Sequence, residues 1–198
     1  KKHDLLVATD EIYSELTYGI EHTAFASIEG MWERTVTING FSKSYAMTGW
    51  RLGYIAAPEG LAQEILKVHQ YNVACAATIS QYAGMEAMKN GDSDIAAMRV
   101  HYDERRKFLV RSLWEMDLKC FEPKGAFYAF PSIKETGLSS EEFAKRLLYE
   151  GKVAVVPGSA FGENGEGFVR LSYATSMDNL AEAVKRMKAF IKTLKKGR

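Results

Sequence analysis

The sequence predicts an α/β protein in two lobes, because two kinds of pattern alternate along its 198 residues. Short continuous runs of apolar residues occur at 5–8, 35–38 and 53–57, and such runs are typical of strands buried on both faces of a mostly parallel sheet. Longer stretches with apolar residues at helical spacing follow these runs. With 46% hydrophobic residues, the chain has enough apolar material for a packed core.

The same patterns place the remaining elements along the chain. Helices are expected at 59–70, 76–89, 92–116, 139–150 and 177–195. Short strands are expected in the second half of the chain, at 120–121, 126–130, 153–156 and 168–172. Strands and helices therefore alternate in both halves of the chain, as in α/β folds.

The longest amphipathic stretch runs from Asp92 to Met116, and a helix of this length often connects two lobes. We therefore expect two lobes that join near residue 100. The pattern turns Arg105, Arg106 and Lys107 toward solvent, on the face opposite the apolar residues.

Composition and charge exclude several classes of function. The chain has 26 basic and 25 acidic residues, and this balance favours neither nucleic acid nor a membrane surface as a partner. The two cysteines lie far apart and match neither a zinc-binding nor a redox spacing, so no metal site is expected. The sequence contains neither a signal-peptide pattern nor an apolar run that could span a bilayer, and we expect a cytoplasmic protein.

The most informative stretch is 39–54, a polar connection between two apolar runs. It presents Lys43 after the first run and Arg51 just before the second, while Asp10 and Tyr13 follow the first apolar run of the chain. Because ligands of open α/β sheets bind at the carboxyl ends of strands, we expect these four side chains to meet at one edge of the sheet.

This combination of side chains has a chemical logic. A lysine amine forms a Schiff base with a carbonyl compound, and an aspartate beside a pyridine nitrogen keeps that nitrogen protonated. The planar fork of an arginine suits a phosphate group. A lysine and an acidic partner for the ring nitrogen are what proteins usually contribute to pyridoxal phosphate chemistry.

The sequence also resembles the class I and II aminotransferases of the fold type I pyridoxal phosphate-dependent family. The resemblance rests on Ser42-Lys43, on Arg51-Leu52-Gly53 after seven intervening residues, and on the upstream Asp10-Glu11-Ile12-Tyr13. The stretches 124–128, 157–162 and 169–172 are similar to that family as well and follow in its order. The resemblance therefore covers essentially the whole chain.

The resemblance implies a role for each of five residues. Lys43 would be the catalytic residue, which holds the cofactor as a Schiff base and moves a proton. Asp10 would pair with the pyridine nitrogen of the cofactor, Tyr13 would bond its phenolic oxygen, and Arg51 would hold its phosphate. Arg170 would bind the α-carboxylate of an amino-acid substrate with both of its terminal nitrogens.

The resemblance further implies an aminotransferase that moves an amino group from an amino acid to a 2-oxo acid. Members of the family are longer, so we interpret the chain as the C-terminal half of such an enzyme, with the N-terminal half missing. Residues 1–104 would form the C-terminal part of the large cofactor-binding domain, and residues 105–198 the small α/β domain. The intact enzyme is expected to be a homodimer, with 71–81 at the subunit interface.

Several alternatives stay open at this point. A lyase or synthase uses the same cofactor chemistry on the same scaffold, and the chain as given is alternatively an inert fragment. Some members of the family hold the phosphate with a serine three residues before the lysine, where this chain has Gly40. The aromatic residues of 125–128 either pack on a sheet face or contact the substrate.

Overall fold

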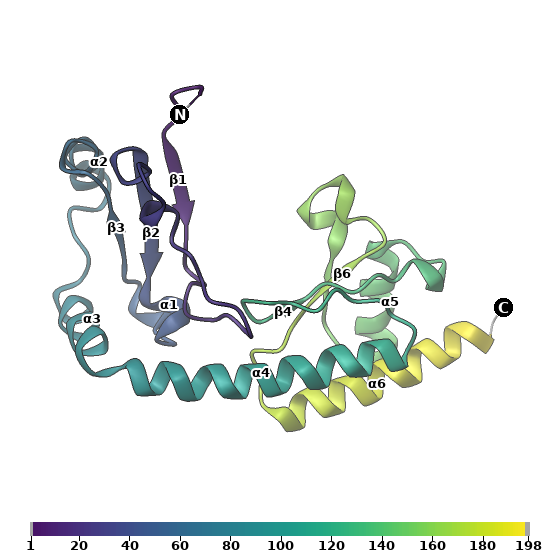
Figure 1. Ribbon diagram of the computed structural model, residues 1–198. Coiled ribbons are helices and arrows are strands. Elements are labelled where there is room, and N and C mark those ends of the chain that lie inside the picture. The colour runs from purple at the N-terminus through teal and green to yellow at the C-terminus, as the bar shows by residue number, and fades with distance from the viewer. Residues whose placement is uncertain (1, 197–198) are drawn as a thin grey trace. The chain divides into compact units, whose positions relative to one another are not determined.

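The computed structural model describes residues 2–196, and the chain divides into two compact units. One unit ends at Arg99 and the other begins at Val100, inside the long helix α4 (Asp92–Glu115). Each unit has a three-stranded sheet of its own, and Figure 1 traces the elements in chain order. Within residues 2–196, no helix is both long enough and apolar enough to cross a membrane.

The N-terminal unit contains the sheet β1-β2-β3, formed by β1 (Val7–Asp10), β2 (Thr35–Gly40) and β3 (Gly53–Ala56). Strands β1 and β2 are parallel, as predicted, whereas β3 runs antiparallel to β2. A mostly parallel sheet was predicted, and β3 is its antiparallel strand. The connection at 41–52 holds only a one-turn helix and a 3-10 turn, so it has no crossover helix to carry the chain back along the sheet.

The strands of this sheet are more exposed than the apolar runs predicted. All four residues of β3 are exposed, including Tyr54 and Ile55. Helix α2 (Glu59–Val73) has no buried residue, and α3 (Thr78–Asn90) buries only Ser80 and Gly84. A sheet is buried on both faces only when packed layers cover both, and the described residues of this unit do not supply them.

The C-terminal unit contains the antiparallel sheet β4-β6-β5, formed by β4 (Tyr128–Ala129), β6 (Val169–Ser172) and β5 (Val156–Pro157). Two helices accompany it, α5 (Ser140–Gly151) and α6 (Met177–Lys196). The strand predicted at 120–121 does not form. Phe121 is highly exposed there, and strands need a partner and a packed face to be stable.

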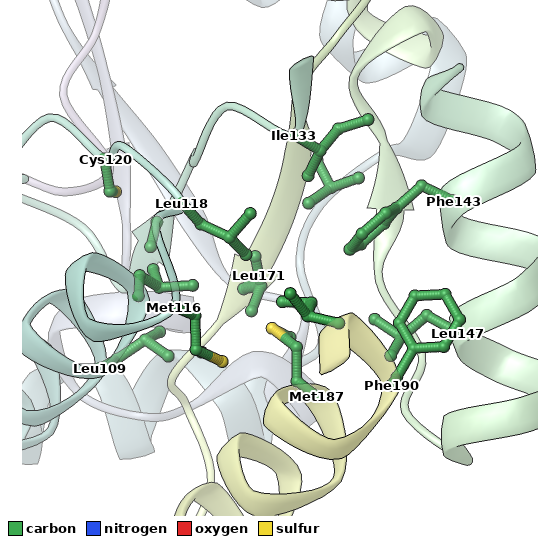
Figure 2. Close-up of a cluster of buried hydrophobic side chains, with 14 of the residues drawn as sticks. Leu109, Met116, Leu118, Cys120, Ile133, Phe143, Leu147, Leu171, Met187 and Phe190 are labelled. Carbon is green, nitrogen blue, oxygen red and sulfur yellow. The ribbon is translucent and has the colours of Figure 1, made fainter. Parts of the chain in front are cut away.

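The core of the C-terminal unit lies on one face of its sheet. Successive residues of β6 alternate between faces, so that Val169 and Leu171 are buried and Ser172 is exposed. Figure 2 shows buried side chains of the core, contributed by α4, α5, β6, α6 and the intervening segments: Leu109, Leu118, Ile133, Phe143, Leu147, Leu171, Met187 and Phe190. Burying one such side chain contributes about 1.5–3 kcal/mol.

Arg106 on α4 is buried in the C-terminal unit, which corrects the prediction that it faces solvent. Its Nε donates to Oδ1 of Asp103 at 2.8 Å, and its Nη1 donates to Oε1 of Glu122 at 2.6 Å and to the carbonyl oxygen of Pro123. Two carboxylates and a carbonyl therefore compensate the cost of burying the guanidinium. The helical pattern does not reveal this, because Glu122 and Pro123 lie outside the helix.

Glu11 is the buried acid of the N-terminal unit, with 6% of its surface exposed. Its Oε2 lies 3.0 Å from Nε2 of His22, and its Oε1 accepts hydrogen bonds from the backbone N–H of Phe25 at 2.9 Å and from Oγ1 of Thr9. Burial raises the pKa of Glu11, but the hydrogen bond and charge of His22 and the N–H of Phe25 outweigh it, so the pKa lies below its ordinary value. The carboxylate fastens the loop at 22–25 to the end of β1.

Replacing Glu11 by glutamine should therefore destabilise the protein in a pH-dependent way. Because the folded-state pKa is lowered, the stabilisation is present above the ordinary pKa of 4.5 and is lost as the pH falls through the folded-state pKa. At pH 7 we expect Glu11→Gln to lower the free energy of unfolding by about 1–3 kcal/mol. Urea unfolding at several pH values measures the difference, which should shrink below pH 4.5.

The exposed Glu21, in the same loop, provides the control, and Glu21→Gln should leave the stability nearly unchanged. A destabilisation by Glu11→Gln that has the same size at every pH would contradict the ionic role of Glu11.

Candidate active site

One edge of the N-terminal sheet collects the polar segments of that unit. Asp10 is the last residue of β1 and pairs in register with Ile38 of β2. Helix α1 (Phe41–Ser44) begins directly after β2 ends at Gly40, which lies opposite Gly53, the first residue of β3. The carboxyl ends of β1 and β2 and the start of β3 therefore share one edge.

Lys43 lies on α1, immediately beyond this edge, and its side chain is partly buried. The connection that carries it is fastened at several points. Oγ1 of Thr48 donates to the carbonyl oxygen of Ser42 at 2.9 Å, and the N–H of Phe41 donates to the carbonyl oxygen of Leu52 at 3.3 Å. The backbone around Lys43 is thus held by contacts with both ends of the 41–52 connection.

Arg51 stands two residues before β3 with a left-handed backbone, at a φ of 52°. Its Nη1 donates to the carbonyl oxygen of Thr48 at 2.9 Å, and the residue is exposed. Ala46 in the same connection is left-handed as well, with a φ of 53°. Such conformations cost a non-glycine residue about 1–3 kcal/mol each and cluster at functional sites.

Asp10 and Tyr13 follow β1 at this edge. Oδ1 of Asp10 accepts a hydrogen bond from the N–H of Ile12 at 3.1 Å, which forms the turn that leads to Tyr13. Asp10 is exposed, and within residues 2–196 its Oδ2 makes no hydrogen bond. The next residue in the chain, Glu11, points to the other side because side chains alternate along an extended chain.

A side-chain bridge links the segments that carry Asp10 and Lys43. Nδ2 of Asn39 donates to Oγ of Ser14 at 3.2 Å, while Oδ1 of Asn39 accepts from the N–H of Gly40 at 2.7 Å. The roles of Asn39, Ser14 and the buried Glu11 were not predicted from the sequence. Their only sequence signal was a polar residue at a strand end, which does not reveal a partner many residues away.

Gly40 stands where some members of the resembled family have serine, and the space around this position is tight. A Cβ at this position would lie 3.0 Å from the carbonyl oxygen of Leu52 and 3.1 Å from Cα of Gly53. Strands β2 and β3 therefore approach more closely than a side chain at position 40 comfortably allows.

Arg170 belongs to the C-terminal unit, where it lies on β6 and points away from the core. Its guanidinium carbon is 4.5 Å from the ring centre of Tyr128 and 4.7 Å from that of Phe161. In the part of the chain that the structure describes, no carboxylate pairs with it. The structure thus brings Asp10, Tyr13, Lys43 and Arg51 to one sheet edge and places Arg170 in the other unit.

Comparison with known proteins identifies the family of the chain. The family described as Aminotransferase class I and II matches residues 1–187. The putative aminotransferase YugH of Bacillus subtilis is 56% identical over 96% of this chain and 50% of its own length. An aspartate aminotransferase of Pyrococcus abyssi is 50% identical, and aromatic-amino-acid aminotransferase 2 of Thermococcus litoralis is 48% identical; 98% of this chain and 51% of each relative are covered.

Solved structures agree with this assignment. An aromatic aminotransferase from Pyrococcus horikoshii superposes with a TM-score of 0.94 at 49% identity, covering 98% of this chain and 52% of that one. An aspartate aminotransferase from Thermus thermophilus with maleate superposes with a TM-score of 0.89 at 37% identity, covering 96% of this chain and 49% of that one. The fold is that of the fold type I aminotransferases.

The chain spans about half the length of the curated relatives that it matches. The matched region covers the N-terminal unit, most of the C-terminal unit and every predicted site residue. The residues that carried the resemblance, from Asp10 to Arg170, therefore lie inside the matching region, and the chain belongs to the class I and II aminotransferase family.

Proposed function

We propose that this chain holds pyridoxal phosphate through Lys43 and takes part in the transfer of an amino group from an amino acid to a 2-oxo acid. The observation that carries the proposal is the arrangement of Asp10, Tyr13, Lys43 and Arg51 at one sheet edge. Class I and II aminotransferases use this cofactor, and the chain belongs to that family.

The side chains at this edge match the functional groups of the cofactor. An amine, a carboxylate, a phenol and a guanidinium complement its aldehyde, ring nitrogen, phenolic oxygen and phosphate in turn. When bound, the cofactor supplies an electron-withdrawing ring that makes a proton on the substrate's α carbon easier to remove. Each residue then has a separate task.

Lys43 has two tasks in this proposal. Its Nζ would hold the cofactor at the aldehyde carbon until the amino group of the substrate takes its place there. The released amine would then take a proton from the α carbon of the substrate and give it to that same cofactor carbon. The bonds of Thr48 and Phe41 hold the connection around it, so the amine starts from a fixed backbone position.

Asp10 and Arg51 have hydrogen-bonding groups left for the cofactor. The turn at Ile12 uses Oδ1 of Asp10, so Oδ2 would accept from a protonated ring nitrogen. Thr48 uses Nη1 of Arg51, so the Nε and Nη2 groups would donate to phosphate oxygens. Tyr13 would donate to the phenolic oxygen.

Arg170 would bind the α-carboxylate of the substrate. A guanidinium without a carboxylate partner among the described residues has its donors available for one. The Thermus thermophilus structure with maleate supports a carboxylate ligand, because maleate carries two such groups.

Lys43→Ala should abolish covalent attachment of pyridoxal phosphate. The unmodified protein should gain a visible absorption band when the cofactor is added. After borohydride reduction, mass spectrometry should find the mass of the cofactor on the peptide that contains Lys43. The exposed Lys67, which pairs with Glu64 on α2, provides the control, and Lys67→Ala should be labelled normally. Reduction products spread over many lysines, with Lys43→Ala labelled as strongly, would contradict the proposal.

The reaction itself separates the alternatives. With pyridoxal phosphate, an amino acid and a 2-oxo acid, we expect the amino group to move between the two acids, as followed by chromatography. Release of ammonia or pyruvate without amino exchange would contradict the transaminase and favour a lyase. Absence of turnover together with absence of cofactor attachment would favour an inert chain.

We also propose that two copies associate through the segment around 71–81, as the family resemblance implies. Apolar side chains are unusually exposed there, with Tyr71 at 88%, Val73 at 60% and Ile79 at 70%. Apolar patches of this kind mark interaction surfaces.

Ile79→Asp should therefore weaken self-association by about tenfold or more, since a charge would be buried in an apolar contact. Analytical ultracentrifugation over a range of protein concentrations measures the change. Phe121→Asp alters a residue in the C-terminal unit that is 83% exposed and should leave association unchanged. A protein that is monomeric at every concentration would disprove the interface.

A further inference from the structure

The face of the C-terminal sheet that points away from the core carries a cluster of aromatic rings. Phe130 and Phe168 stack in parallel, with ring centres 5.4 Å apart and planes at 4°. Phe161 meets Phe130 edge-on at 6.1 Å. Arg170 projects from β6 on this face, and its guanidinium lies against Tyr128 and Phe161.

The rings of Tyr128 and Phe161 contact Arg170 without using its hydrogen-bond donors. Aromatic rings attract a guanidinium through their faces, whereas the N–H groups of a guanidinium point outward in its own plane. The contacts therefore restrict the side chain and leave its donors available. A free arginine side chain has many rotamers, so restricting it in advance lowers the entropy cost of a later bidentate contact.

The backbone around Phe161 is itself braced. Gly158 and Gly165 pack so closely that a Cβ at Gly165 would lie 2.0 Å from the carbonyl oxygen of Gly158. The buried Oγ of Ser140 accepts hydrogen bonds from the N–H groups of Gly167 at 2.8 Å and Phe168 at 3.2 Å. These contacts fix both ends of the loop at 158–168.

Burial does not explain why an aromatic ring stands at position 161. Phe161 is 53% exposed, although it sits on a braced loop, so its ring contributes little to the core. Its described contacts are with Phe130 and with Arg170. The ring of Phe161 therefore contributes more to holding the Arg170 guanidinium than to the stability of the unit.

We infer that Tyr128 and Phe161 are positioning residues, which hold the Arg170 guanidinium in one orientation for a substrate carboxylate. The inference rests on the proposed function, because it takes Arg170 as the carboxylate-binding group. It gives Tyr128 a role that is neither core packing nor direct contact with substrate, whereas Phe127 of the same segment packs against the core. The rings act on the substrate only through Arg170.

Nitrogen NMR of the Arg170 Nε–H group in the full chain tests this inference, with maleate as the carboxylate probe. In the unmodified protein the group should be ordered and should shift saturably as maleate is added. Phe161→Leu and Tyr128→Leu should each loosen it and raise the Kd for maleate by about three- to tenfold. Phe161→Tyr keeps the ring and should restore the affinity.

Three further measurements make the test specific. Arg170→Gln should abolish the saturable binding, and the exposed Phe121 provides a matched control in which Phe121→Leu leaves the Kd unchanged. Thermal unfolding monitored by circular dichroism should show that both leucine variants stay folded. A merely structural role would lower the melting temperature without changing the order of the Arg170 group at a temperature where the variant is folded.

Two results would overturn the inference. One is an unchanged Arg170 Nε–H signal and Kd in both leucine variants, and the other is an absence of Arg170-dependent maleate binding in the unmodified chain. Labelling of Lys43 tests the proposed function separately. If Lys43 is not labelled but the leucine variants still lose maleate affinity, the positioning of Arg170 stands. Only the aminotransferase proposal then fails.

Discussion

The arrangement of the N-terminal unit depends on the close approach of β2 and β3 at Gly40 and Gly53. These two residues pair in register, and the separation leaves little room for a side chain at position 40. Because the strands are antiparallel and joined by a short connection, the residues just after β2 and just before β3 return to the same edge. Lys43 and Arg51 are brought together in this way, with the left-handed Ala46 and Arg51 as the conformational cost.

The two adjacent acids at the end of β1 differ in their surroundings. Asp10 is exposed at the edge with one oxygen bound in a turn, whereas Glu11 is buried and binds His22 and Phe25. Alternation along an extended chain sends neighbouring side chains to opposite sides, so the exposed acid and the buried acid occupy consecutive positions. The carboxylate of Glu11 therefore holds the loop at 22–25 against the end of β1, directly beside Asp10 in the chain.

The two units contribute different chemistry. The N-terminal unit presents an amine, a carboxylate, a phenol and a guanidinium at one sheet edge, a set suited to a cofactor with several polar groups. The C-terminal unit presents Arg170, held by aromatic rings on the face opposite its core. The same alternation that buries Val169 and Leu171 in β6 directs Arg170 outward, so core packing and the proposed carboxylate-binding group share one short strand.

The sequence by itself determined the family and the helices, and it singled out the side chains of the proposed site. The helix predicted at 177–195 occupies Met177–Lys196, and the one predicted at 59–70 occupies Glu59–Val73, because helical periodicity is a local property. Only the tertiary structure decided the antiparallel direction of β3, the burial of Arg106 and the partners of Glu11 and Asn39. Each of these depends on residues distant in sequence: Arg106 is buried because Glu122 folds back onto α4, and Glu11 because His22 returns to β1. A local sequence pattern shows the residue types, but it does not show these long-range contacts.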